Sequence, residues 1–244
     1  DNDYVWSNPV LDKQGLLRGT YYYDPTPDSE GGEELRLLRY ENGSWTFEKI
    51  KDGGCKDSSL AFARSNEPGI SYGILTPQLT GPLYYAKRDG GVWPEGELVF
   101  PGGIYYTASQ LFFDSQDKPV IYYGYMENET SAPIKVARKT SEGWPTKDAY
   151  SGPVALGHDD NVVIATNKGH DFEAWLYREN SDSWDSKVII EVSQDKGTAL
   201  PWDIVIDGNN RAHVLVHGGT DVGQVIATEN ASGTFIYEAV GTPP

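Results

Sequence analysis

The chain has 244 residues and a formal net charge of -16, and it contains 16 Tyr, 7 Trp, 27 Gly and 15 Pro. The negative charge repels phosphate backbones and anionic lipid surfaces, which argues against nucleic-acid and membrane partners. The single cysteine, Cys55, excludes an internal disulfide. No apolar run of about 18 residues is present to cross a membrane.

Two sequence markers recur along the chain in a fixed order. The first is an acidic or amide turn between two apolar strands, at residues 12–15, 65–68, 115–118, 159–161 and 207–210. The second is a turn that ends in an aromatic residue, at Trp45, Trp93, Trp144, Trp184 and Phe235, with spacings of 48, 51, 40 and 51 residues. Because the two markers share one period and one order, they indicate five copies of one structural unit.

The strands expected within a unit are short and bounded by turn residues. In the third unit the pattern predicts strands at 109–113, 119–124 and 134–138 and a fourth that begins at Trp144. In the last unit it predicts strands at 202–206, 212–216, 224–228 and 235–239. No helical pattern interrupts either unit, so each one is expected to be a four-stranded antiparallel sheet.

A four-stranded antiparallel unit of about 40–50 residues, repeated without helices, is typical of a β-propeller blade. We therefore predict an all-β chain that folds as a single five-bladed β-propeller domain over residues 1–244. The expected blades are approximately 4–53, 54–103, 104–150, 151–196 and 197–240. A β-sandwich and an open solenoid are the alternatives, although a sandwich lacks this long, even period. The first strand is expected to be an inner one and the last an outer one.

The second and third units resemble a widespread β-propeller repeat of secreted and surface proteins. The resemblance is carried by Ser59–Phe62 with Pro68–Tyr72 and Leu83–Ala86, and by Leu111–Ser115 with Pro119–Tyr123. These segments combine an apolar strand, an Asp-Ser-x-Gly-like turn, a Pro-led strand that ends in Tyr-Tyr, and a Gly-x-Trp turn. The resemblance implies the fold only, because propellers host unrelated functions.

Loops at one mouth of such a ring converge over an apolar scaffold, which favours a ligand site there. His217 and His170 are predicted as catalytic acid or base groups because each is followed by a carboxylate that could orient it. Asp203 and Tyr106 complete the expected catalytic set. The predicted ligand-binding residues at the same mouth are Trp6, Tyr23, Asp57, Tyr105, Trp202, Asp171 and Asp221.

The framework markers recur in every unit but the mouth residues diverge, which favours one asymmetric pocket over repeated sites. Phosphate-loop, serine-elbow and zinc motifs are absent from the sequence. We therefore expect a cofactor-free enzyme that binds one small, largely apolar or ring-containing molecule and catalyses dehydration, isomerisation, cyclisation or a pericyclic step, as in natural-product biosynthesis. A lectin-like sugar-binding propeller and a glycoside hydrolase with mouth carboxylates are the alternatives. No metal site is predicted, although the many Asp residues leave open a Ca²⁺ in the axial channel.

Three Asn-x-Ser/Thr sequons begin at Asn42, Asn128 and Asn230. All three fall in expected turns or loops, where a glycan could be accommodated. They favour a secreted protein or passage through the secretory pathway. Cys55 is expected to be a small packed residue, because free cysteine usually behaves as an apolar group.

Overall fold

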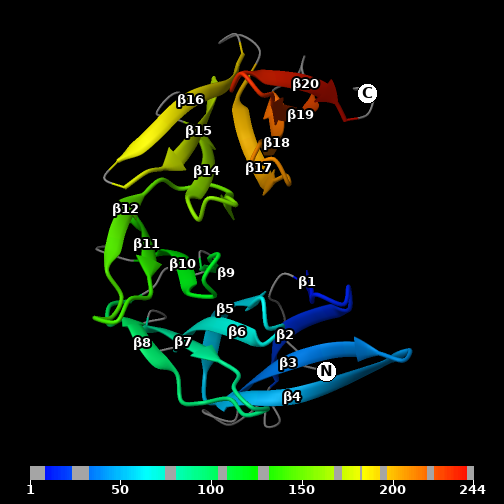
Figure 1. The fold of residues 1–244 in the computed structure, drawn as a ribbon, viewed down its shortest axis with the longest axis vertical. Coiled ribbons are helices and arrows are strands. Elements are labelled where there is room, and N and C mark those ends of the chain that lie inside the picture. Colours follow the sequence, from blue (N-terminus) through cyan, green and yellow to red (C-terminus); the bar gives the residue numbers. More distant parts are fainter. Residues whose placement is uncertain are drawn as a thin grey trace. The chain divides into compact units, whose positions relative to one another are not determined.

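The fold was analysed in a computed structural model, which describes residues 9–23, 33–74, 81–103, 109–125, 132–167, 172–181, 183–192, 197–218 and 223–240. These residues form five four-stranded antiparallel sheets, each built from consecutive strands (Figure 1). The all-β class and the five predicted repeats are confirmed. Among the described residues, no helix has the length and apolar character needed to cross a membrane.

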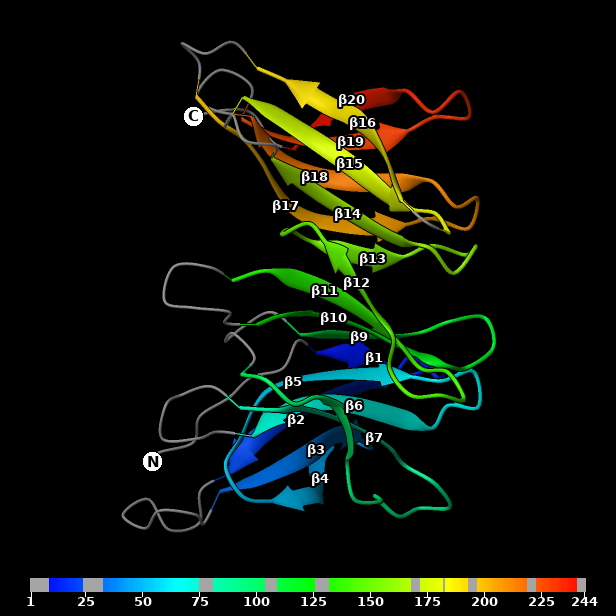
Figure 2. The ribbon, with the colours of Figure 1, turned by 90° about the vertical axis from the view of Figure 1, so that its left-hand side faces the viewer.

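The chain divides into two compact units, Asp1–Ala149 and Tyr150–Pro244. The first unit holds three sheets and the second holds two (Figures 1 and 2). Sheet 1 consists of β1 (Val10–Leu11), β2 (Leu17–Tyr23), β3 (Glu34–Glu41) and β4 (Ser44–Asp52). Sheet 2 consists of β5 (Cys55–Phe62), β6 (Pro68–Ile74), β7 (Leu83–Lys87) and β8 (Glu97–Phe100). Sheet 3 consists of β9 (Gln110–Phe113), β10 (Pro119–Gly124), β11 (Ile134–Arg138) and β12 (Thr146–Ala149).

The second unit repeats the same plan. Sheet 4 consists of β13 (Val154–Leu156), β14 (Val162–Asn167), β15 (Glu173–Glu179) and β16 (Trp184–Glu191). Sheet 5 consists of β17 (Ala199–Ile206), β18 (Ala212–Gly218), β19 (Gln224–Glu229) and β20 (Phe235–Ala239). Every sheet lies within one predicted blade, because turn residues and strand periodicity follow local rules that the sequence displays directly.

Apolar side chains of neighbouring sheets form the core of the first unit. One cluster joins sheets 1 and 2 through Leu35, Cys55, Ile70, Tyr72 and Ala86. A second joins sheets 2 and 3 through Leu83, Tyr85, Val99, Leu111, Ile121, Tyr123 and Ala137. Strand β6 lies in the middle sheet of this unit and is buried from Pro68 to Gly73. Its continuous burial explains why its sequence lacks the apolar-polar alternation of a half-exposed strand.

Cys55 is part of this core and has an exposed fraction of only 1%. Burial raises the pKa of its thiol to about 12. The side chain therefore acts as a small packed group, in line with the sequence-based expectation.

The second unit has its own core between sheets 4 and 5. Its buried members include Val163, Leu176, Ile189, Val214 and Val216. Along β18, buried and more exposed residues alternate. The buried ones are Ala212, Val214, Val216 and Gly218. The alternation is expected of a sheet that buries one face more deeply than the other.

The acidic turns predicted from sequence are closed by their first carboxylate. The Oδ1 atom of Asp12 accepts hydrogen bonds from the amides of Gln14 and Leu16, both at 2.9 Å. Asp114 and Asp207 make the same pair of bonds to the amides two and four residues later, at 2.8 to 3.0 Å. Such bonds satisfy backbone groups that the tight turn leaves unpaired.

The same turns also connect one sheet to the next. The amide of Lys13 donates to Oδ1 of Asn66 at 2.9 Å, and the amide of Arg64 donates to Oδ1 of Asp117 at 2.6 Å. In the second unit the amide of His158 donates to Oδ1 of Asn210 at 2.9 Å. The three accepting residues have positive φ values of 66°, 59° and 61°, a conformation that Asn and Asp tolerate better than most residues. Residues that the sequence identifies only as parts of a local turn thus also connect neighbouring sheets.

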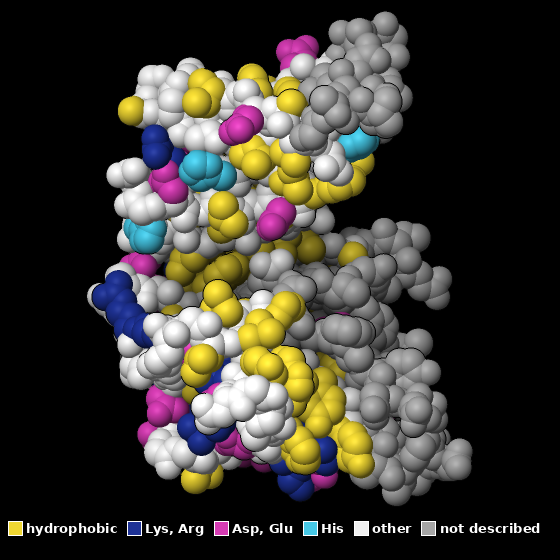
Figure 3. Space-filling view, turned by 90° about the vertical axis from the view of Figure 1, so that its right-hand side faces the viewer, with side chains coloured by type: hydrophobic (Ala, Val, Ile, Leu, Met, Phe, Trp, Pro, Cys, Tyr) yellow, Lys and Arg dark blue, Asp and Glu magenta, His cyan; other side chains and the backbone are white. Residues whose placement is uncertain are grey.

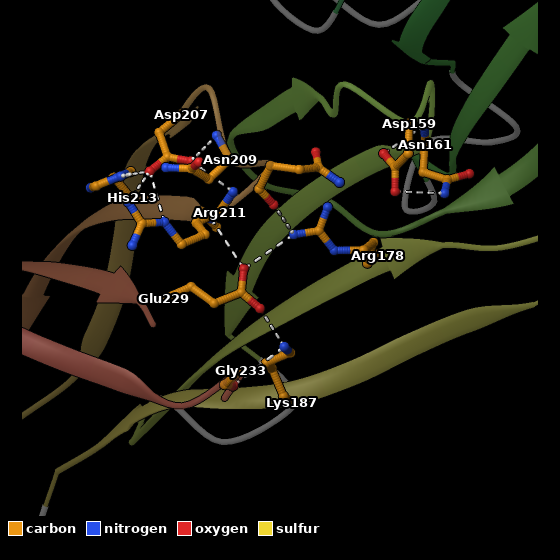
Figure 4. A network of polar contacts seen from close by, with 12 residues as sticks. Asp159, Asn161, Arg178, Lys187, Asp207, Asn209, Arg211, His213, Glu229 and Gly233 are labelled. Atoms are coloured by element: carbon orange, nitrogen blue, oxygen red, sulfur yellow. Dashed lines mark hydrogen bonds and ion pairs between the residues drawn. The ribbon is translucent and has the colours of Figure 1, made fainter. Parts of the chain in front are cut away.

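A charged network supports sheets 4 and 5 (Figure 4). The carboxylate of Glu229 pairs with Lys187 and, at 3.1 Å, with Arg178, and it accepts the amide of Ala212 at 3.1 Å. Burial, the largest single influence, works to raise the pKa of Glu229, but these hydrogen bonds and the two cations lower it below its ordinary value.

His213 belongs to the neighbouring part of the network. Its Nε2 lies 3.3 Å from Asp207 Oδ2, and its Nδ1 lies 3.1 Å from Thr228 Oγ1. Asp207 also binds the Arg211 guanidinium at 2.6 and 2.9 Å. The hydrogen bond from that guanidinium is the main cause of the lowered pKa of Asp207. Both ring nitrogens of His213 therefore contact groups of the strand and the turn, which indicates a structural role for this residue.

Candidate functional site

Five of the sequence-predicted site residues are described by the structure, and they lie on strands. Tyr23 ends β2, Asp57 lies within β5, Trp202 and Asp203 lie within β17, and His217 lies within β18. Trp202 and Asp203 lie within the strand predicted at 202–206. The expectation that Tyr23, Asp57 and His217 belong to mouth loops was wrong, because the strands extend further than their sequence patterns indicate, as in the register of Leu200 with His217. The predicted residues that lie outside the described part of the chain are Trp6, Tyr105, Tyr106, His170, Asp171, Asp221 and Asn128.

Trp202 is presented to solvent by an irregularity in β17. In the β17–β18 pair, Pro201 is opposite Val216 and Asp203 is opposite Leu215, so Trp202 is an extra residue without a register partner. A β-bulge of this kind bends the strand and changes the direction of a side chain. The exposed fraction of Trp202 is 53%, a high value for the largest apolar side chain.

His217 supports the indole of Trp202 from one side. The ring centroids are 5.4 Å apart and the planes differ by 13°, which is a stacked arrangement. The Nδ1 atom of His217 is buried and has no hydrogen-bond partner among the residues that the structure describes. One face of the indole is therefore covered by an imidazole that is itself held by the strand.

Asp203 follows Trp202 directly and adds a carboxylate beside the indole. Its Oδ1 accepts the amide of Ile204 at 2.8 Å, and the residue is exposed. A carboxylate keeps several acceptor positions after one such bond. Trp202, Asp203 and His217, which we call the indole platform, thus combine an open aromatic face with a hydrogen-bond acceptor.

Asp57 occupies a second bulge, in β5 between Lys56 and Ser59, with a φ of 54°. The bulge brings the neighbouring Ser58 against sheet 1, where its amide donates to the Tyr22 hydroxyl at 2.9 Å and its Oγ lies 2.8 Å from Thr20 Oγ1. Burial raises the pKa of Tyr22.

On the other side of the bulge, the carbonyl of Asp57 accepts the Ser109 hydroxyl at 2.6 Å. The Asp57 segment therefore joins three sheets of the first unit.

Tyr23 makes a cation–π contact with Arg36. The Arg36 guanidinium carbon lies 3.7 Å from the Tyr23 ring centroid and 4.5 Å from that of Phe47. The same guanidinium pairs with Glu34 at 2.6 Å and donates to the Tyr21 hydroxyl at 3.2 Å. One face of Tyr23 is therefore engaged by Arg36, and the residue is only partly exposed, whereas Trp202 is 53% exposed.

The structure also contains a pocket of about 210 Å³ that the sequence analysis did not identify. It lies in the first unit between sheets 1 and 2. Its lining consists of Ile50, Lys51, Asp52, Tyr72, Ala86, Trp93, Pro94 and Glu95. A comparison of successive repeats contains a signal for it, because the charged members of this lining have uncharged counterparts one repeat later: Phe100 for Lys51, Pro101 for Asp52 and Thr146 for Glu95.

Two sequons are described. Asn42 has a φ of 52° in the turn between β3 and β4. Asn230 begins the turn between β19 and β20, where its Nδ2 donates to Thr234 Oγ1 at 2.6 Å and its Oδ1 accepts the amides of Ser232 and Thr234. A glycan on Asn230 would have to form on a nitrogen that already stabilises its turn.

The described residues contain no candidate metal site. Over the parts of the chain that the structure describes, no group of three or more His, Cys, Asp or Glu side chains is arranged to hold a metal ion. The indole platform and the pocket consist instead of aromatic rings with charged groups at their edges, a composition suited to organic ligands.

Comparison with known proteins supports the fold but identifies no family. No family model matches the sequence, and no curated protein matches it. A polysaccharide lyase of family PL25, an ulvan lyase, aligns with 94% of this chain and 68% of its own, with a TM-score of 0.60 and 10% identity. An α-L-arabinanase from Penicillium chrysogenum covers 94% of this chain and 79% of its own, with a TM-score of 0.58 and 13% identity.

A Hadza microbial sialidase gives a similar result, with a TM-score of 0.59, 13% identity and coverage of 93% of this chain. The present chain spans only 56% of that sialidase. These neighbours are β-propeller-like, carbohydrate-active proteins. At such low identity the similarity establishes the type of sheet repeat and not the chemistry.

Proposed function

We propose that this protein binds carbohydrate, and that the indole platform is its principal contact. The proposal depends on one observation: the Trp202 indole is 53% exposed and is stacked on His217 on one side. A flat, pre-positioned aromatic face binds the apolar C–H face of a sugar ring while polar groups at its edge accept the ring hydroxyls. Asp203 supplies such an acceptor.

The open position of Trp202 favours this function over the cofactor-free cyclase expected from sequence. Enzymes of that class expel water from around a small apolar substrate, so they enclose it. An indole exposed to solvent suits a ligand that stays partly hydrated, as a glycan does. The structurally similar proteins, among them a lyase that acts on ulvan and an arabinanase complexed with arabinobiose, give independent support.

Binding to a glycan array, followed by calorimetric titration with the best glycan, tests the proposal. We expect Trp202→Ala to abolish binding and leave the fold intact. Trp45→Ala is the matched control, because Trp45 is exposed to the same extent at 54% but meets Tyr40 in a tilted contact at 51°. Equal binding by the wild type and the Trp202 variant would remove the platform from the site.

Hydrolysis of the bound glycan is not part of the proposal. A glycoside hydrolase needs two carboxylates about 5–10 Å apart, and two of the predicted mouth carboxylates, Asp171 and Asp221, lie outside the described residues. Release of reducing ends during the binding assay would reveal such an activity directly.

We further propose that the five sheets close into one five-bladed propeller and that the protein is secreted. Five consecutive sheets of one design and the β-propeller-like neighbours support the ring. The three sequons support the secretory route. A ring requires all five sheets to melt together, so calorimetry of the whole chain should show one transition. Two separate transitions, or independent folding of residues 150–244, would contradict the single domain.

A further inference from the structure

The pocket between sheets 1 and 2 combines an aromatic floor with a charged rim. Tyr72 and Trp93 contribute aromatic surface, and Pro94 lies beside Trp93. Tyr72 is held in place by stacking on Tyr84, with centroids 5.8 Å apart, and its hydroxyl occupies the space that a side chain on Gly96 would need. The position of Tyr72 is therefore set by contacts within its own sheet.

Sheets 2 and 3 share the framework residues of this pocket, but apolar side chains pack between these two sheets. Tyr72, Ala86, Trp93 and Pro94 recur 51 residues later as Tyr123, Ala137, Trp144 and Pro145. The indole nitrogens of both tryptophans are buried without a partner among the described atoms, which marks them as shared framework.

The residues around that framework differ between the two sheet pairs. Lys51 is opposite Leu35 beside a bulge in the β3–β4 pair, and Phe100 is opposite Leu83 beside the matching bulge in the β7–β8 pair. At the place of Lys51 the second pair of sheets therefore has Phe100, whose ring packs on Tyr123 and Tyr125 with centroids 5.4 and 5.0 Å away. Asp52 is likewise replaced by Pro101, and Glu95 by Thr146. The three charged residues are thus the feature that separates the pocket from a packed interface.

These three residues are placed at the rim. Lys51 Nζ lies 2.5 Å from Glu95 Oε1, and Glu95 is 82% exposed. Asp52 is 75% exposed and binds Lys49 at 3.0 Å. In each pair the carboxylate is in solvent, although Lys51 itself is only 22% exposed. Ion pairs with a solvated partner contribute little to stability, so folding alone gives little reason to prefer them to the apolar residues of the second pair. They can exchange partners with a ligand at small cost.

The size and charge of the pocket limit what it can bind. A volume of about 210 Å³ is below the roughly 300–1,000 Å³ of sites for drug-sized molecules, so one ring is the largest unit it can take. Each of the two rim carboxylates is paired with an ammonium group, Asp52 with Lys49 and Glu95 with Lys51, so the rim has no net charge to attract a charged ligand. The rim offers both acceptors and a donor, which matches a ring with several hydroxyl groups.

We propose that this pocket binds one neutral monosaccharide ring, such as the terminal residue of a glycan. Trp93 contacts the apolar face of the ring, Asp52 and Glu95 accept its hydroxyl protons, and Lys51 donates to a hydroxyl oxygen. The choice of a sugar rests on the proposed function, whereas the contrast between the two sheet pairs does not depend on it. The site shares no residue with the indole platform.

Fluorine NMR of protein labelled with 5-fluorotryptophan tests the proposal. The chain has seven tryptophans, so each candidate site has its own resonance, assigned with single Trp→Phe variants. The probes are the methyl glycosides of glucose, galactose, mannose, fucose and arabinose, with glucuronate and methylammonium as charged comparisons. We expect at least one neutral glycoside to shift the Trp93 resonance in a saturable way and to leave Trp144 unmoved.

Lys51→Phe is the decisive variant, because it installs the residue that the second pair of sheets already accommodates. We expect it to fold and to weaken glycoside binding at Trp93 by about tenfold or more. The proposal is overturned if no neutral glycoside shifts Trp93, if Trp93 and Trp144 shift alike, if a charged probe binds more tightly, or if Lys51→Phe binds as the wild type does. The Trp202 resonance reports separately on the indole platform, so failure of one site is distinguished from failure of the other.

Discussion

The rings of Trp202 and His217 lie in nearly parallel planes although the two residues are not register partners. His217 is opposite Leu200, and Trp202 is the extra residue of the bulge two positions further on. The indole and the imidazole therefore meet as diagonal neighbours across the two strands, beside the bulge.

His217 is expected to act as a positioning residue for the proposed sugar contact. His217→Ala removes the support under the indole and should weaken glycan binding by about tenfold, whereas His217→Phe keeps a flat ring there and should preserve most of it. Calorimetric titration of both variants measures the effect. Full binding by His217→Ala would show that Trp202 is held by other contacts.

Asn66 is expected to stabilise the contact between sheets 1 and 2. Asn66→Gly keeps the positive φ but loses the acceptor for the Lys13 amide, so it should lower the free energy of unfolding by about 1 kcal/mol. Asn42→Gly, in a turn with a similar φ of 52°, is the control and should be nearly neutral. Urea unfolding of the two variants measures the difference, and equal effects would assign the loss to the backbone alone.

Glu229 is expected to make stability depend on pH. Glu229→Gln removes the charge that pairs with Lys187 and Arg178 and should cost about 2 kcal/mol at pH 7. The pKa of Glu229 is lowered in the folded state, so its contribution is present above the unfolded value of about 4.3 and is lost as the pH falls through the folded value.

The gap between Glu229→Gln and the wild type should therefore narrow below about pH 4, as measured by urea unfolding across pH. Glu238→Gln, at an exposed position of β20, is the control and should change little at any pH. A gap that stays constant down to pH 3 would contradict the assignment to ionisation.

Cys55 is expected to report on global unfolding. Its pKa of about 12 leaves little reactive thiolate at pH 8, and the side chain is 1% exposed. Ellman's reagent should therefore react slowly with the native protein and rapidly in urea, with a midpoint that matches the loss of tryptophan fluorescence. Rapid modification of the native protein would show that sheets 1 and 2 open locally.

The sequence by itself determined the repeat, the strands and the turns of this protein. Asp114 closes its turn and Pro119 begins the next strand because both effects act within a few residues, and such local rules are visible as patterns. The Trp at the end of the turn in successive repeats was found in the same way.

The tertiary structure alone decided what each tryptophan does. Trp93 and Trp144 share one sequence context, yet one lines a pocket and the other meets Tyr85 in a packed edge contact. The difference arises because Lys51 and Glu95, 44 positions apart in the chain, meet across two sheets. The periodicity of a strand indicates which side chains share a face, but only packing between faces establishes which neighbour fills the space.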